Sequence, residues 1–197
     1  MPSAAVTRCP WCEGVSDAYQ AYHDEEWGVP LRDDAGQFEF LILEGAQAGL
    51  SWSTVLHKRD GYREAFAGFD AERMARFGKR DVNRLLQNPA IIRNRLKVAA
   101  AIGNAQAYLK IQEESGSFSD YLWRFVDGRA VQNHWERQAD VPATSAVSNA
   151  LAKDLQRRGF KFVGSTIMYA HMQATGLVND HLVSCYRYAA CAALATP

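Results

Sequence analysis

The sequence has no net charge and no long apolar run. Lys plus Arg and Asp plus Glu both number 22 among 197 residues, which argues against a uniformly basic nucleic-acid-binding protein. No apolar run approaches the roughly 20 residues that cross a membrane, and Met1 to Cys12 lack the apolar region of a secretory signal. We therefore expect a cytoplasmic protein without a membrane partner. With 48% hydrophobic and 22% charged residues, the composition also excludes collagen, a disordered tail and a coiled coil.

The charges are unevenly distributed along the chain. Residues 13–44 hold nine acids and one base, whereas residues 79–97 and 153–164 hold a clear excess of bases. This asymmetry allows a basic face for phosphates and a separate acidic region. Ordinary charged patches on helix surfaces would give the same pattern, so charge alone leaves both interpretations open.

The apolar residues recur at helical spacing almost throughout. We expect helices after the N-cap pair Asp33 and Asp34, and over residues 81–86, 89–108, 117–126, 146–158 and 165–175. Gly176 is well placed to end the last of these. Only residues 160–163 alternate as a strand does, and four residues cannot found a sheet. The sequence thus predicts one all-α domain over residues 1–197, an orthogonal helical globule.

A short turn with a glycine at each end separates the last two predicted helices, residues 146–158 and 165–175. Gly159 and Gly164 enclose Phe160, Lys161, Phe162 and Val163, and a new helix starts at Ser165. This pattern is typical of a helix-hairpin-helix motif, here about residues 146–175. Glycines permit close approach of the backbone, and the second helix presents free N–H groups to a phosphate. We expect Gly159, Lys161, Gly164 and Ser165 to bind a DNA backbone, although a plain tight loop fits the same pattern.

The four cysteines lie near the chain ends. In a cytoplasmic protein they favour metal binding or burial over disulfides. Cys9 is followed by His23, and His181 and Cys185 have a spacing that puts two ligands on one helix face. Two sulfurs and two nitrogens favour Zn²⁺, and four protein ligands make the site structural. Cys9 and Cys12 also have zinc-knuckle spacing, so spacing alone leaves Cys12 and His23 as alternatives.

The most unusual segment is residues 43–52, Leu-Glu-Gly-Ala-Gln-Ala-Gly-Leu-Ser-Trp. Glu44 ends an apolar run, where a carboxylate is costly unless it is paired or used. Several aromatic residues lie in the same quarter of the chain: Trp11, Tyr19, Tyr22, Trp27 and Trp52. Aromatic faces with one carboxylate suit a flat cationic heterocycle. A core aromatic cluster with Glu44 paired to an arginine is the alternative.

Taken together, these segments resemble the 3-methyladenine DNA glycosylase I family. The resemblance runs in order from about residue 7 to 188, through residues 8–11, 21–30, 43–52, 91–95, 158–164 and 172–181. It implies a bacterial DNA-repair enzyme with a helix-hairpin-helix fold that excises 3-methyladenine from alkylated double-stranded DNA. It also implies one structural zinc ion between the terminal segments, about residues 9–23 and 181–185. The matching ligands are Cys9, His23, His181 and Cys185.

The resemblance further assigns the base pocket. Glu44 matches the family's catalytic glutamate, and Trp11, Tyr19, Tyr22 and Trp52 are the expected base-binding residues. We do not expect Asp180 to be the catalytic acid or base, because it adjoins a metal ligand. No lysine is placed as a Schiff-base nucleophile, so we expect a monofunctional hydrolase without strand cleavage. A monomer is the simple expectation for a repair enzyme that scans DNA. The alternatives are a non-catalytic sensor of alkylated DNA and a zinc hydrolase.

Overall fold

The structure, a computed structural model, describes residues 6–195; the ends of the predicted domain 1–197 lie outside this range. Its α-helices and strands are α1 (Asp17–Glu25), α2 (Asp34–Gln47), α3 (Trp52–Leu56), α4 (Arg59–Ala65), α5 (Ala71–Ala75), α6 (Lys79–Gln87), α7 (Arg95–Ser115), α8 (Phe118–Trp123), β1 (Val131–Gln132), α9 (Ala146–Arg157), α10 (Ser165–Ala174), β2 (Val178–Asn179) and α11 (Tyr186–Ala193). Short 3-10 turns occupy Pro10–Cys12, Ala67–Phe69, Arg124–Val126 and Gln138–Asp140.

The prediction of a mainly helical fold is confirmed, and side-chain caps explain where many helices begin. Asp33 accepts a hydrogen bond from Gly36 N at the start of α2, and Ser145 accepts one from Ser148 N at the start of α9. Such caps satisfy N–H groups that the first helical turn leaves free. Between β1 and β2 there is only a two-residue parallel pairing, which the sequence did not predict.

One predicted helix was wrong in its bounds. Residues 89–108 were expected to be helical, but α7 begins only at Arg95 and continues to Ser115. The Asn94 side chain accepts hydrogen bonds from Leu96 N and Lys97 N, which caps α7 there. Asn88 likewise bonds Ala90 N and stabilises the preceding turn. The predicted helix over 117–126 is α8 followed by a 3-10 turn.

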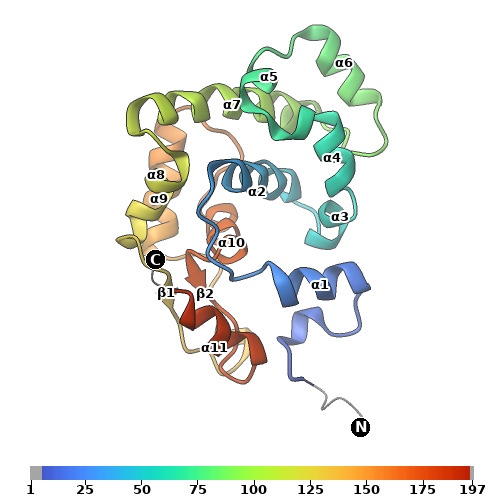
Figure 1. Cartoon of the computed structure of the whole chain (residues 1–197). Coiled ribbons are helices and arrows are strands. Elements are labelled where there is room, and N and C mark those ends of the chain that lie inside the picture. Colours follow the sequence, from blue (N-terminus) through green and yellow to red (C-terminus); the bar gives the residue numbers. More distant parts are fainter. Residues whose placement is uncertain (1–5, 196–197) are drawn as a thin grey trace.

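Helix α2 forms the centre of the molecule. It lies between α7 and α10 and also packs on α3 and α8 (Figure 1). Nearly every residue of its second half is buried, including Leu41 and Leu43. A helix buried on all faces requires apolar residues all round, so the buried Glu44 near its end is an exception that calls for a function.

The two ends of the described chain pack against different elements, the N-terminal segment against the start of α11 and the C-terminal end beside β1. Tyr186 N donates a hydrogen bond to Thr7 O, and Ala130 N donates one to Ala195 O. Gly176 follows α10 with φ +68°, and a Cβ there would lie 2.4 Å from the backbone of Val29. Only glycine fits this approach. None of the helices described between residues 6 and 195 is long and apolar enough to span a membrane.

Candidate functional site

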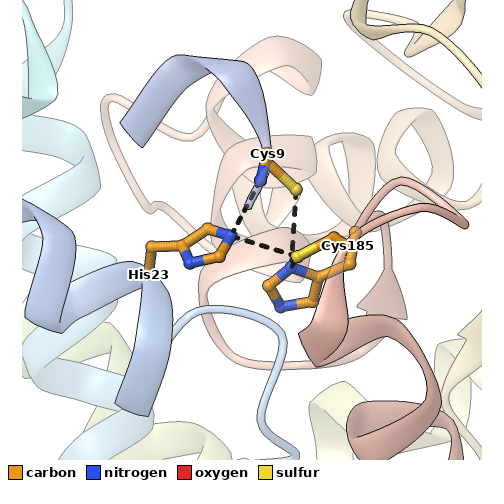
Figure 2. A group of neighbouring side chains, drawn as sticks. Cys9, His23 and Cys185 are labelled. Carbon is orange, nitrogen blue, oxygen red and sulfur yellow. Dashed lines mark hydrogen bonds between the residues drawn. The ribbon is translucent and has the colours of Figure 1, made fainter. Parts of the chain in front are cut away.

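Four buried side chains from the two chain ends converge in one cluster. The ligand-type atoms of Cys9, His23, His181 and Cys185 all lie within 4.8 Å of one another. Cys185 Sγ lies 3.5 Å from His23 Nε2 and 3.6 Å from His181 Nδ1, and Cys9 Sγ lies 3.6 Å from His181 Nδ1. Figure 2 shows Cys9, His23 and Cys185 turned towards a common centre. These four residues, called the metal-type cluster below, could hold one metal ion.

The distances fit a tetrahedral ion. Bond lengths of about 2.3 Å to sulfur and 2.0–2.1 Å to nitrogen place neighbouring S and N ligands about 3.6 Å apart. The other ring nitrogens are already engaged: His23 Nδ1 lies 2.8 Å from Asp24 Oδ1, and His181 Nε2 lies 2.9 Å from Trp27 O. Such partners fix each imidazole so that its remaining nitrogen faces the centre.

Two further groups complete the surroundings of this cluster. Arg8 forms a bidentate ion pair with Asp24 and thereby holds the pKa of that carboxyl well below its usual range. The pKa of the Cys185 thiol is lowered, chiefly by a hydrogen bond from the Cys9 thiol. A thiolate is the form of cysteine that binds metals.

The structure separates the two ligand alternatives and corrects one local expectation. Cys12 lies outside the cluster, because its thiol donates to Cys9 O at 3.1 Å. His181 and Cys185 do not lie on a helix: Cys185 N donates to Leu182 O in a turn, and Cys185 is the N-cap of α11. The turn, rather than a helix face, brings the two side chains together.

A pocket of about 180 Å³ lies beside the metal-type cluster. Its walls contain all five residues that the sequence predicts around the base: Trp11, Tyr19, Tyr22, Glu44 and Trp52. Six further residues line it that the sequence does not predict there: Trp27, Gln47, Gln138, Val141, Ala170 and Gln173. Five of these lining residues are aromatic. Tyr22 lies 5.3 Å from Trp52 and stacks near Tyr19, with ring centroids 6.4 Å apart. A flat aromatic ligand would be flanked on more than one side.

The pocket and the metal-type cluster share a wall. Trp11 follows Cys9 in the same 3-10 turn, and its ring meets the edge of His23 at 5.1 Å. Trp27 lies 5.0 Å from Trp11 and 4.6 Å from the His181 ring. A metal ion that fixed Cys9 and the two histidines would therefore also fix the tryptophans of the pocket.

Glu44 is the charged group of this pocket. It is 3% exposed, and its buried Oε2 has no hydrogen-bond partner in the part of the chain that the structure describes. Burial raises the pKa of Glu44 from 4.5 to about 8. The expected alternative, a pairing with an arginine, is not found among the described residues, and the nearby Arg59 binds Glu26 and Glu39 instead. A cation entering the pocket would favour the ionised form of Glu44.

A second, open cavity of about 180 Å³ adjoins the pocket on the other side of Glu44. It is lined by Gln47, Leu50 and Ile167 among others, and Leu50 is 41% exposed. Gly49, with φ +76°, turns the chain so that Leu50 stands out at the mouth.

The loop between α9 and α10 is held firmly against the rest of the molecule. Lys161 N donates to Asn104 Oδ1 at 2.8 Å, and Asn104 Nδ2 donates to Lys161 O at 3.0 Å. The Ser165 hydroxyl bonds Asn149 and Ser148 of α9. Gly159 has φ +95° and open space around its Cα, Lys161 is exposed, and Gly164 gives α10 no side-chain cap. Three of the predicted backbone-binding residues thus lie on this loop, and Ser165 is the first residue of α10.

Some residues of the site were missed from the sequence. Gln138 and Val141 come from a polar connection without periodicity, and Gln173 and Ala170 come from α10, whose direction only the folded chain defines. Gln47 lies in the motif that drew attention to Glu44. Lys97, part of the basic run 79–97, is used internally, because its Nζ donates to Ala46 O and Ala48 O at the end of α2.

Comparison with known proteins agrees over almost the whole chain. The family model described as methyladenine glycosylase matches residues 11–188. DNA-3-methyladenine glycosylase 1 of Escherichia coli (strain K12) is 48% identical, covering 93% of this chain and 97% of that protein. A crystal structure of 3-methyladenine DNA glycosylase I is 50% identical with a TM-score of 0.89, covering 91% of this chain and 98% of the other.

A further solved structure carries a ligand. It is a tyrosine-to-phenylalanine variant of 3-methyladenine DNA glycosylase I in complex with 3-methyladenine, 37% identical with a TM-score of 0.89 over 92% of this chain and 97% of that one. A family match over most of the chain, together with identities well above 30%, establishes kinship. The chain belongs to the methyladenine glycosylase family.

Proposed function

We propose that this protein is a DNA glycosylase that excises 3-methyladenine from alkylated DNA. The observation that carries the proposal is the buried, unpartnered carboxylate of Glu44 in an aromatic pocket, in a chain of the methyladenine glycosylase family. Such a pocket has one charge to complement and flat surfaces to stack on, which suits a methylated purine.

The reaction starts with extrusion of the damaged nucleotide. Methylation at N3 gives the purine in DNA a positive charge and weakens its pairing, so that flipping it out costs less than for a normal base. Tyr22 and Trp52 flank the flipped base, and Trp11 and Tyr19 close the aromatic wall. Leu50, exposed at the mouth, enters the gap in the duplex.

Glu44 distinguishes the cationic base from normal adenine. In the empty pocket its pKa is about 8, so much of it is protonated at neutral pH. A cationic base stabilises the carboxylate and displaces this proton, whereas neutral adenine does not. The ionised Glu44 accepts a hydrogen bond from the exocyclic amine and complements the positive charge of the reacting nucleotide. Water adds to the deoxyribose C1′ as the C1′–N9 bond breaks; the electron pair of that bond goes to the base, which leaves as neutral 3-methyladenine, and the water releases a proton to solvent. The methylated base is already a good leaving group, so one carboxylate suffices.

The proposal also assigns roles to the loop between α9 and α10 and to the metal-type cluster. Residues 146–175 act as a helix-hairpin-helix that binds a DNA phosphate through the loop of Gly159, Lys161, Gly164 and Ser165. Cys9, His23, His181 and Cys185 hold one Zn²⁺, since two sulfurs and two nitrogens suit that ion. With four protein ligands, the ion supplies structural cross-linking of the terminal segments. The chain acts as one domain and as a monomer, without strand cleavage.

The test is chromatography of free bases released from methylated duplex DNA by wild type, Glu44→Gln and Glu136→Gln. Glu136 is exposed, so its variant is a matched control. We expect 3-methyladenine from wild type and the control, and a loss of about 100-fold or more in Glu44→Gln. No release by folded, zinc-loaded wild type would refute the enzyme and leave a sensor of alkylated DNA. Trapping of a covalent protein–DNA adduct with borohydride would refute a monofunctional mechanism.

A further inference from the structure

A second buried carboxylate lies behind the pocket and is fully hydrogen-bonded. Asp180 is 2% exposed and accepts four hydrogen bonds from uncharged groups. Its Oδ1 accepts from Asn133 Nδ2 at 2.7 Å and Trp135 Nε1 at 2.8 Å. Its Oδ2 accepts from Tyr169 OH at 2.7 Å and Gln173 Nε2 at 2.8 Å. Asp180 itself is absent from the pocket wall, whereas Gln173 is part of it.

The hydrogen bond to Asp180 fixes the orientation of the Gln173 amide, that is, which side its NH₂ group and its carbonyl oxygen face. A carboxylate only accepts hydrogen bonds, so the NH₂ group of the amide has to face it. The carbonyl Oε1 is the amide atom that remains, and it accepts no hydrogen bond from the residues that the structure describes. One N–H of Gln173 is thus committed to Asp180, and its carbonyl Oε1 is the acceptor that this pocket-lining residue has free for a ligand.

We propose that Asp180 is a positioning residue that fixes Gln173 as a second hydrogen-bond acceptor for the exocyclic amine of the base. The inference rests on the proposed function and extends it to the choice between methylated purines. An exocyclic amine has two N–H groups, and the pocket then contains two acceptors, Glu44 and Gln173 Oε1. 3-Methyladenine has this amine at C6. 3-Methylguanine has a carbonyl oxygen there, which would face two acceptors.

The network makes the consequence of Asp180→Asn predictable. Trp135 Nε1 can only donate, so an oxygen of the new amide has to remain on the side of Trp135 and Asn133. The new NH₂ then lies on the side of Tyr169 and Gln173. The Tyr169 hydroxyl can rotate to accept, and the Gln173 amide has to turn over to accept as well. Its own NH₂ would then face the pocket, which converts an acceptor into a donor.

Three variants separate this arrangement from general damage. Asp180→Asn reverses the polarity of Gln173, and Gln173→Met removes the amide while keeping a side chain of similar length. Trp135→Phe is the matched control, because it removes a hydrogen bond from the opposite oxygen of Asp180 and leaves the bond to Gln173. Zinc content and thermal unfolding are measured for each, since Asp180 adjoins His181.

The readout is the ratio of kcat/KM for excision of 3-methyladenine and 3-methylguanine from methylated duplex DNA. We expect this ratio to fall about tenfold or more in Asp180→Asn. In Gln173→Met it should fall less, through loss on 3-methyladenine alone, and in Trp135→Phe it should stay at the wild-type value. Equal losses on both bases in Asp180→Asn and Gln173→Met would overturn the proposal. If Asp180→Asn fails to fold, an unchanged ratio in Gln173→Met overturns it alone. Failure of wild type to release 3-methyladenine would instead overturn the proposed function.

Discussion

Replacing Glu44 by glutamine should raise the free energy of unfolding, although it should lower the rate of base excision. Glu44 is buried without a partner, and burial raises its pKa from 4.5 to about 8. A raised pKa in the folded state means that folding favours the protonated form. The contribution of Glu44 to the free energy of unfolding is therefore greatest below pH 4.5, and it is lost as the pH rises through 8. Glutamine does not titrate, so the Glu44→Gln variant does not lose unfolding free energy in this way as the pH rises.

The size of the effect follows from the two pKa values. At 1.36 kcal/mol per pH unit, the full difference corresponds to about 5 kcal/mol, of which about 2 kcal/mol is already lost at pH 6. Between pH 6 and pH 9, wild type should lose about 3 kcal/mol relative to Glu44→Gln. Steric and hydrogen-bonding changes in the variant are the same at both pH values and cancel in this comparison.

The assay is urea-induced unfolding of zinc-loaded wild type, Glu44→Gln and the exposed control Glu136→Gln at pH 6 and pH 9. Comparing variants at each pH removes any effect of pH on the metal ligands. The difference in unfolding free energy between Glu44→Gln and wild type should widen by about 3 kcal/mol, and Glu136→Gln should show no such widening. A constant difference for Glu44→Gln would refute the argument that Glu44 is buried and unpaired.

Three other outcomes are expected. The kcat/KM of wild type on methylated DNA should rise with pH towards about 8, where free Glu44 ionises; a flat profile over pH 6–9 would exclude Glu44 as the ionising group. Removal of the proposed zinc ion by a chelator should lower the melting temperature by roughly 10 °C. This shift corresponds to about 4 kcal/mol of stabilisation by an ion at a thousandfold excess over its Kd. Activity should fall with the unfolded fraction, and its loss at an unchanged melting temperature would contradict a structural site. Leu50→Ala should weaken excision from duplex DNA about tenfold and leave the affinity for free 3-methyladenine unchanged. The affinity is measured by titration of tryptophan fluorescence. An equal loss of excision and of affinity would place Leu50 in the base pocket.

The sequence predicts best those features that local chemistry determines. Asp33 and Ser145 cap helices wherever the chain folds, because they bond backbone groups only three residues away. Glu44 stands out because a carboxylate within an apolar run needs an explanation. The aromatic residues of the pocket all lie within the first 52 residues, and this density suggests a cluster.

Features that depend on contacts between distant segments could not be derived in the same way. Spacing left Cys12 and His23 as alternative ligands, and only the family resemblance favoured His23; the structure then turns Cys12 towards a backbone carbonyl. Lys97 belongs to a basic run, but the end of α2 that it binds is 49 residues away. Gln173 enters the pocket because α10 packs on α2 and Asp180 holds its amide, neither of which leaves a periodic signal.

We propose that Glu44 and the surrounding aromatic rings recognise and release a methylated adenine. Single-turnover excision of 3-methyladenine from methylated duplex DNA, compared between wild type and Glu44→Gln at pH 8, tests it most directly. We expect release by wild type and a rate about 100-fold or more lower in the folded, metal-loaded variant. Equal rates in the two proteins would contradict it.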